Sequence, residues 1–143
     1  MFKPSELAYT CFQMNLALTE KSAVKILIVD DGEHARRMIK RYLNSLADEF
    51  CECADGADAL AAYRAFMPDW VLMDWEMKQM DGLTATRGII DAFPKARVLM
   101  FTQYDDQELR RAANEAGACG FFPKDDLLDL SEFFKKQQLL IRR

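Results

Sequence analysis

The sequence is short of histidine, of paired cysteines and of long apolar runs, and each shortage excludes a class of protein. Only one of the 143 residues is histidine, His34, and no nucleophile motif accompanies it as a Ser-His-Asp triad would require. The four cysteines lack CxxC spacing and stand apart from His34, which argues against a zinc site. No run approaches the length of a membrane span, and nothing resembles a secretory signal. We therefore expect reduced cysteines, no membrane association and a cytoplasmic location.

Clustered positive charge is also scarce. The chain has 19 Lys and Arg against 23 Asp and Glu, giving a net charge of −4. Binding to a phosphate backbone needs clustered Lys and Arg. The short basic groups, such as Arg36-Arg37 and Lys40-Arg41, lie among apolar residues at helical spacing, so we interpret most of them as solvated helix faces. No direct contact with nucleic acid is expected.

The sequence from Lys25 onward alternates between apolar runs and helical patterns. The runs are "KILIV" (25–29), "FCECA" (50–54), "WVLM" (70–73), "RVLMFT" (97–102) and "CGFFPK" (119–124). The helical patterns cover 33–46, 55–66, 81–93, 105–117 and 125–140. Such alternation is typical of an α/β fold, here a five-stranded parallel sheet flanked by five helices.

Some details of the helices are also predicted. Asp81 and Asp105 are expected to be helix N-caps, and Gly117 to end a helix. In the helix over 81–93 the residues expected to face the sheet are Leu83, Thr86, Ile90 and Phe93. Residues 1–23 differ from the rest: Leu7, Cys11, Met14 and Leu18 have helical spacing, but a loose extension or a later start at Met14 fits equally well.

Polar residues with complementary chemistry end four of the five predicted strands. Asp30-Asp31 follow the first, Asp74 the third, Thr102 ends the fourth and Lys124 the fifth. The carboxyl ends of parallel strands meet at one rim, which is where open sheets bind ligands. Three nearby carboxylates repel one another, and Mg²⁺ prefers oxygen ligands and often shares its shell with phosphate. The pattern predicts a phosphoryl site in which a carboxylate can be the nucleophile.

These segments together resemble the receiver domain of two-component response regulators. The resemblance runs from about Val24 to Gln138 and rests on "ILIVDD", "VLMDWEMKQMDGL", "VLMFT" and "AGACGFFPKDD" in that order. It implies a flavodoxin-like sheet of strand order 2-1-3-4-5. We expect a receiver domain over residues 24–140, preceded by an extension of unknown role over 1–23.

The resemblance also implies a role for each residue at the rim. Asp74 would be the phosphoacceptor, with Thr102 as the switch hydroxyl and Lys124 as the lysine that contacts the phosphoryl group. Mg²⁺ would be bound by Asp30, Asp31, Asp74 and the backbone carbonyl of Glu76, with Asp31 the more direct ligand of the acidic pair. Phe121 would occupy the aromatic switch position. One departure is Lys78, which stands where the family very often has proline and predicts a less stiff loop.

The partners implied are a histidine kinase or histidine phosphotransfer protein as donor and a downstream protein as target. Phosphorylation would shift the face built from residues 105–117, 120–122 and the last helix, and a homodimer through this face is an open alternative. No sequence remains after the last helix for an output domain, so signalling is expected to pass through protein contacts rather than an enzymatic activity.

Two other functions are suggested by parts of the sequence. "KD" at 124–125 and the tail "KKQQLLIRR" favour the receiver portion of a longer helix-turn-helix DNA-binding regulator. The acids of "DWE" (74–76) resemble those of aspartate-nucleophile hydrolases. Those enzymes, however, carry the pair after their first strand and need substrate-covering elements that this chain lacks.

Overall fold

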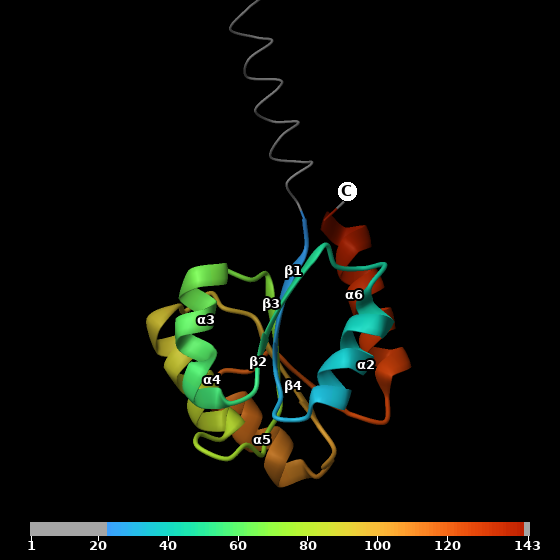
Figure 1. The fold of residues 1–143 in the computed structure, drawn as a ribbon. Coiled ribbons are helices and arrows are strands. Elements are labelled where there is room, and N and C mark those ends of the chain that lie inside the picture. Colours follow the sequence, from blue (N-terminus) through green and yellow to red (C-terminus); the bar gives the residue numbers. More distant parts are fainter. Residues whose placement is uncertain (1–22, 142–143) are drawn as a thin grey trace, which may run out of the picture.

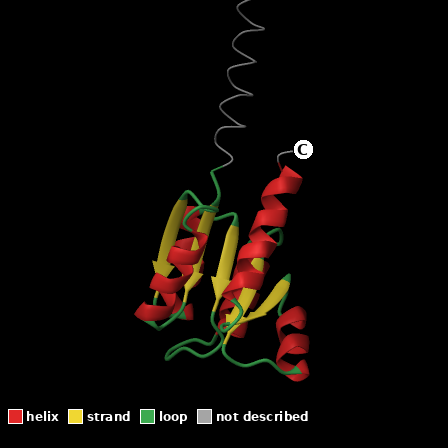
Figure 2. Ribbon diagram, turned by 90° about the vertical axis from the view of Figure 1, so that its right-hand side faces the viewer, coloured by secondary structure: helices red, strands yellow, loops and turns green. Residues whose placement is uncertain are grey.

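Five parallel strands form one sheet in the order β2-β1-β3-β4-β5 (Figures 1 and 2), as predicted. The computed structural model describes residues 23–141, so the predicted extension lies outside it apart from its last residue. The strands are β1 (Lys25–Val29), β2 (Glu49–Cys53), β3 (Trp70–Met73), β4 (Val98–Thr102) and β5 (Gly120–Pro123). All four residues of β3 and all five of β4 are buried, which explains their unbroken apolar sequences.

Helices cover both faces of the sheet and form two separate apolar layers. In Figure 1, α2 and α6 lie on one side, and α3, α4 and α5 on the other. Because side chains alternate along a strand, Ile26 and Ile28 of β1 pack in the α2–α6 layer, and Leu27 and Val29 in the other layer. The helices are α2 (Glu33–Leu43), α3 (Ala59–Phe66), α4 (Gly82–Ala92), α5 (Gln107–Glu115) and α6 (Leu127–Ile141), with a 3₁₀ turn at Gly56–Asp58.

Two details of the helices differ from prediction. In α4, Thr86 is buried as expected, but Ile89 rather than Ile90 is the fully buried isoleucine. Neighbouring positions on a helix differ by about 100° in direction, so the buried face of α4 is turned from the predicted one toward Ala85 and Ile89. The N-cap of α5 is Asp106, not Asp105. Asp106 has the extended backbone of a cap and accepts the Leu109 N–H, which leaves Asp105 to pair with an arginine.

Two other predicted helix signals are confirmed. The Asp81 carboxylate accepts the N–H of Thr84 at the start of α4. Gly117 follows α5 with a φ of 101°, a left-handed conformation that glycine adopts without steric cost.

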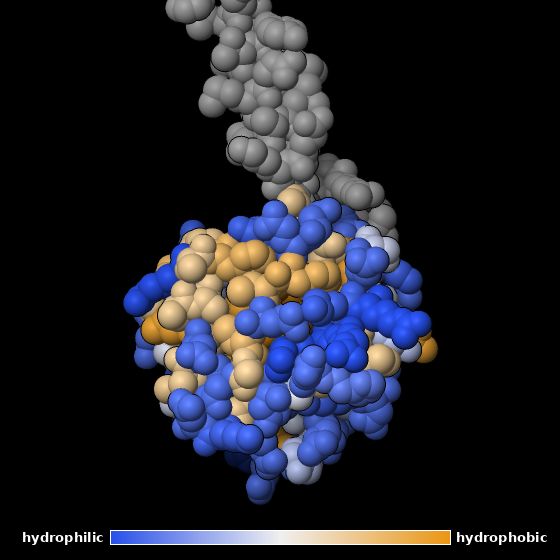
Figure 3. Space-filling view, in the orientation of Figure 1, coloured by the Kyte–Doolittle hydropathy of each residue, from blue (hydrophilic) through white to orange (hydrophobic). Residues whose placement is uncertain are grey.

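The carboxyl ends of the strands point to the lower end of the molecule in Figure 1. Figure 3 shows that this end is largely hydrophilic, whereas apolar surface lies higher on the same face. Among the described residues, no helix has both the length and the apolarity to cross a membrane.

Candidate functional site

The sheet brings the predicted site residues together because its ladder continues one residue past the strands. Asp74 N–H donates to the carbonyl of Val29 at 2.8 Å, which places the residue after β3 beside the end of β1. Lys124 N–H donates to the carbonyl of Thr102 at 2.7 Å, which does the same for β5 and β4. Residues from four strands therefore share one rim.

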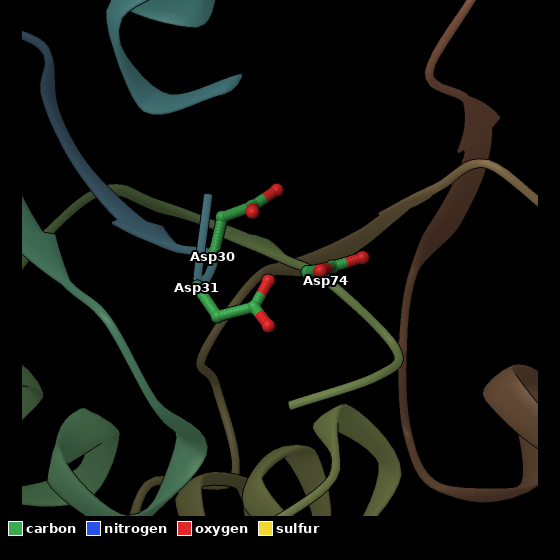
Figure 4. Close-up of side chains that lie close together, drawn as sticks. All are labelled: Asp30, Asp31 and Asp74. Atoms are coloured by element: carbon green, nitrogen blue, oxygen red, sulfur yellow. The ribbon is translucent and has the colours of Figure 1, made fainter. Parts of the chain in front are cut away.

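Three carboxylates gather at this rim (Figure 4). Asp30, Asp31 and Asp74 each offer an oxygen, and these oxygens lie within 4.8 Å of one another. Asp30 and Asp74 are only 2% and 6% exposed, whereas Asp31 is exposed. This grouping of oxygen ligands suits a hard divalent cation such as Mg²⁺.

Lys124 is the counter-charge of the two buried carboxylates. Its Nζ lies 2.7 Å from Asp30 Oδ2 and 3.2 Å from Asp74 Oδ1. Asp30 Oδ1 accepts the Gly32 N–H, and Asp74 Oδ1 the Trp75 N–H, but the buried Asp30 Oδ2 accepts no hydrogen bond of good geometry from any described residue. With all three acids ionised and one ammonium beside them, the group carries a formal charge of −2. That excess of negative charge fits a bound cation.

The environment of this cluster changes how its groups titrate. Burial, and then the charge of Asp30, raise the pKa of Asp74 to about 6, although Lys124 and the Trp75 N–H oppose the shift. Burial lowers the pKa of Lys124, but the two carboxylates outweigh that effect and leave it above its usual value. Lys124 is therefore a permanent cation at neutral pH, whereas the pKa of Asp74 lies only slightly below neutral pH.

The metal-free protein should lose stability as the pH rises from about 4 to about 7. In this window the folded state holds a proton on Asp74 more tightly than the unfolded state, whose pKa is the ordinary 3.8, so the free energy of unfolding falls with increasing pH. One pKa unit corresponds to about 1.4 kcal/mol, and we expect a loss on the order of 2 kcal/mol after solvent screening. Urea unfolding in the presence of a chelator, at several pH values, would measure it.

Asp74→Asn should remove most of this pH dependence, whereas Asp91→Asn, at an exposed position of α4, should keep it. An equal slope in wild type and Asp74→Asn would show that another group causes the loss.

A cavity of about 190 Å³ opens beside the carboxylates. It is lined by Asp31, Asp74, Glu76, Thr102, Gln103, Tyr104 and Lys124. The space is large enough to admit several waters or a phosphoryl group. Thr102 is almost fully buried, and its hydroxyl accepts the Tyr104 N–H at 3.4 Å. A carboxylate, a hydroxyl and an ammonium thus face one small polar space.

All the side chains predicted for the site meet here, and Phe121 lies apart from it on β5. The Phe121 ring is half-buried under the Arg110 guanidinium, whose carbon lies 4.8 Å from the ring centroid. Arg110 also pairs with Asp105 in the loop that follows Thr102, at 2.7 Å. Phe121 is therefore covered by a cation that is paired with the loop following Thr102.

Sequence reasoning missed two supporting residues, Arg36 and Asp55. Arg36 belongs to the basic group expected on a solvated helix face, but its side chain is only 16% exposed and donates to the Asp30 carbonyl at 2.7 Å and to Glu52. Asp55 accepts backbone N–H groups from the loop after Asp74. The available signals were an arginine one turn into the helix after the acid pair and an aspartate before glycine. Neither signal identifies the partner.

A parallel 2-1-3-4-5 sheet with an acid pair, a central acid, a hydroxyl and a lysine at its rim defines the receiver class of signalling domain. The chain belongs to the response regulator receiver domain family, whose model matches residues 26–135. This confirms the resemblance and assigns the chain to two-component signal transduction. The limits predicted for the domain, 24–140, remain a prediction. Receiver domains bind Mg²⁺ at an acidic pocket, and the three clustered aspartates of this chain form a similar group.

Similar proteins differ in what accompanies the receiver. A protein-glutamate methylesterase/protein-glutamine glutaminase of Vibrio parahaemolyticus is 39% identical over 106 residues, which are 71% of this chain and 28% of the relative. The transcriptional regulatory protein DegU of Brevibacillus brevis is 33% identical over 115 residues, covering 78% of this chain and 48% of that protein. The crystallised chemotaxis protein CheY4 of Vibrio cholerae superposes with a TM-score of 0.73 at 25% identity, over 80% of this chain and 98% of its own. The chain thus spans about half or less of these two curated relatives.

Proposed function

We propose that this receiver is switched by transfer of a phosphoryl group to Asp74 from a histidine kinase or a histidine phosphotransfer protein. The supporting observation is the Asp74 carboxylate itself, which is buried at the rim, contacts Lys124 and lines the same cavity as Thr102. In the transfer an Asp74 oxygen bonds to phosphorus while the P–N bond of a phosphohistidine breaks, its electron pair remaining on the donor imidazole. The products are an acyl phosphate on Asp74 and a free histidine on the donor.

Asp30, Asp31, Asp74 and the backbone carbonyl of Glu76 would bind Mg²⁺. Asp31 is the best candidate for a direct carboxylate ligand, because it is exposed and lines the cavity, whereas Asp30 is already engaged by Lys124. Bound there, the ion would offset the repulsion between Asp74 and the incoming phosphoryl group. The remaining polar contacts would come from the chain itself, through the Thr102 hydroxyl and the Lys124 ammonium.

The output would pass through the face formed by α5, β5 and α6. A phosphoryl group on Asp74 adds negative charge beside Thr102 and Lys124, and both can move toward it. Thr102 precedes the loop that holds Asp105 and hence Arg110, which covers Phe121. A change at the rim would thereby bias the exposure of Phe121 and the affinity of this face for a downstream protein or a second copy. The described domain would act through protein contacts and would catalyse no reaction beyond its own phosphorylation. Its location would be cytoplasmic.

A second candidate function is the receiver part of a longer DNA-binding regulator. The observation that favours it is the match to DegU, of which this chain spans 48%. The phosphorylation chemistry would be the same, but the target of the output face would be an attached domain. The full reading frame distinguishes the two, because only the second function requires a DNA-binding domain in the same chain.

Trp75 offers a direct optical test of the proposed site. It is half-buried and its N–H donates to Asp74 Oδ1 at 2.9 Å, whereas the other tryptophan, Trp70, lies in the core at the start of β3. Tryptophan fluorescence should change on addition of Mg²⁺ and again on addition of beryllofluoride, a phosphoryl analogue. The beryllofluoride response should vanish in Asp74→Asn, and Trp75→Phe should abolish both signals. An unchanged beryllofluoride response in Asp74→Asn would contradict the assignment of the acceptor.

A further inference from the structure

The loop between β3 and α4, residues 74–81, carries both Asp74 and Glu76 but has no regular secondary structure and no proline. Its two ends are fixed by backbone hydrogen bonds. Asp74 N–H donates to Val29, and Gly82 N–H donates to the carbonyl of Trp75 at 2.8 Å. Between these ends, a separate element must hold the backbone if the loop is to present its groups to the rim.

Asp55, in the turn after β2, supplies that contact. Its Oδ2 accepts the Gln79 N–H at 2.9 Å, and its Oδ1 accepts the Met80 N–H at 3.0 Å and the Ala57 N–H at 2.9 Å. The residue is only 8% exposed, and the backbone N–H groups around it lower the pKa of its carboxyl group. Both carboxylate oxygens are thus used as acceptors, with one bond inside the turn of Asp55 and two to the loop.

The neighbouring glycine shows how closely the turn and the loop are packed. A Cβ on Gly56 would lie 2.6 Å from the Met80 carbonyl oxygen and 3.2 Å from that of Asp81. A side chain at this position would therefore push the loop away from Asp55. The turn approaches the loop as backbone against backbone, which leaves little freedom to either.

A simpler role for Asp55 would be to cap the 3₁₀ turn at Gly56–Asp58. Only the bond to Ala57 serves that role, since the other two reach 24 and 25 residues along the chain. The side chains of Met77 and Met80 also pack against the core. Such apolar contacts fix the depth of the loop but do not select which way its N–H and carbonyl groups point.

We propose that Asp55 is a positioning residue for the metal site, which fixes the backbone of the 74–81 loop so that Asp74 and the Glu76 carbonyl face the rim together. This inference rests on the proposed function, because it assigns a purpose to the geometry of the same loop. Outer groups that orient metal ligands commonly change affinity 10- to 100-fold when removed.

Mg²⁺ titration monitored by Trp75 fluorescence tests the proposal in Asp55→Ala and Asp55→Asn. Asp55→Ala should weaken Mg²⁺ binding at least about tenfold. Asp55→Asn retains one carbonyl oxygen and should lie between Asp55→Ala and wild type. Amide exchange at Gln79 and Met80 should accelerate in the same order, while the amides of β3 stay protected.

Two matched controls separate positioning from a general loss of stability. Asp58→Ala removes an exposed carboxylate three residues away that makes no capping hydrogen bond, and it should leave Mg²⁺ affinity unchanged. Ile39→Val, in the fully buried part of α2, should lower stability without changing Mg²⁺ affinity. Equal Mg²⁺ affinity in wild type and Asp55→Ala would overturn the positioning role. Failure of the wild type itself to bind Mg²⁺ would overturn the proposed function instead.

Discussion

Asp74→Asn is expected to abolish covalent phosphorylation of this chain. An amide oxygen is a poor nucleophile, and no other described carboxylate combines burial at the rim with contacts to both Lys124 and the cavity. The rate of phosphoryl incorporation from a small acyl phosphate in the presence of Mg²⁺ should fall at least about a thousandfold, as when an enzyme loses its nucleophile. Intact mass spectrometry after incubation with acetyl phosphate measures this directly.

Asp91→Asn, which changes the same chemical group at an exposed site, should be phosphorylated like the wild type. Chelation of Mg²⁺ should suppress the reaction in both the wild type and this control. Stable phosphate on Asp74→Asn, mapped by peptide analysis to Asp30 or Asp31, would mean that the acceptor has been assigned to the wrong carboxylate.

Gly82→Ala is expected to be the most destabilising single-methyl change in α4. A Cβ on Gly82 would overlap with the carbonyl oxygen of Asp74, and neither the helix nor the strand end can accommodate that contact without moving. We expect a loss on the order of 3 kcal/mol in the free energy of unfolding, because overpacking here displaces backbone rather than a flexible side chain. Urea denaturation would measure it.

Gly88 provides the matched control within the same helix. A Cβ there meets nothing within 4 Å, and replacing glycine by alanine in a helix interior usually stabilises by about 0.5–1 kcal/mol. Gly82→Ala and Gly88→Ala should thus shift stability in opposite directions. If both variants unfold at the wild-type midpoint, the helix does not approach Asp74 as closely as described.

Much of this architecture could be predicted because it is encoded locally. Apolar runs that stop at Asp30, Asp74 and Thr102 mark strand ends, and parallel strands must bring those ends to one rim. The order of the strands was predicted from the resemblance to a family, because the spacing of apolar residues does not determine which strands are neighbours. Burial within α4 was predicted less well, because choosing between Ile89 and Ile90 requires the rotation of a helix that is set by tertiary packing.

The supporting contacts could not be predicted for a related reason. Aspartate before glycine indicates a turn, but nothing local states that the Asp55 carboxylate will meet N–H groups of Gln79 and Met80. Likewise, Arg36 has the spacing of a surface residue of a helix. It donates to the Asp30 carbonyl only when the loop between β1 and α2 folds back on the helix. Contacts between two loops depend on the placement of both, and each loop alone is compatible with many placements.

The position of Lys124 couples binding at β5 to cation binding at the acid cluster. β5 and β1 are separated by two strands, yet the ammonium from the end of β5 contacts Asp30 at the end of β1. A protein that binds over β5 and prefers one position of Lys124 must therefore alter the affinity of the acid cluster for a cation. Thermodynamic linkage requires the cation to alter that protein's affinity by the same factor. Binding of a partner protein over β5 and binding of a cation at the rim would thus be coupled through a single side chain, which links the end of β5 to the end of β1.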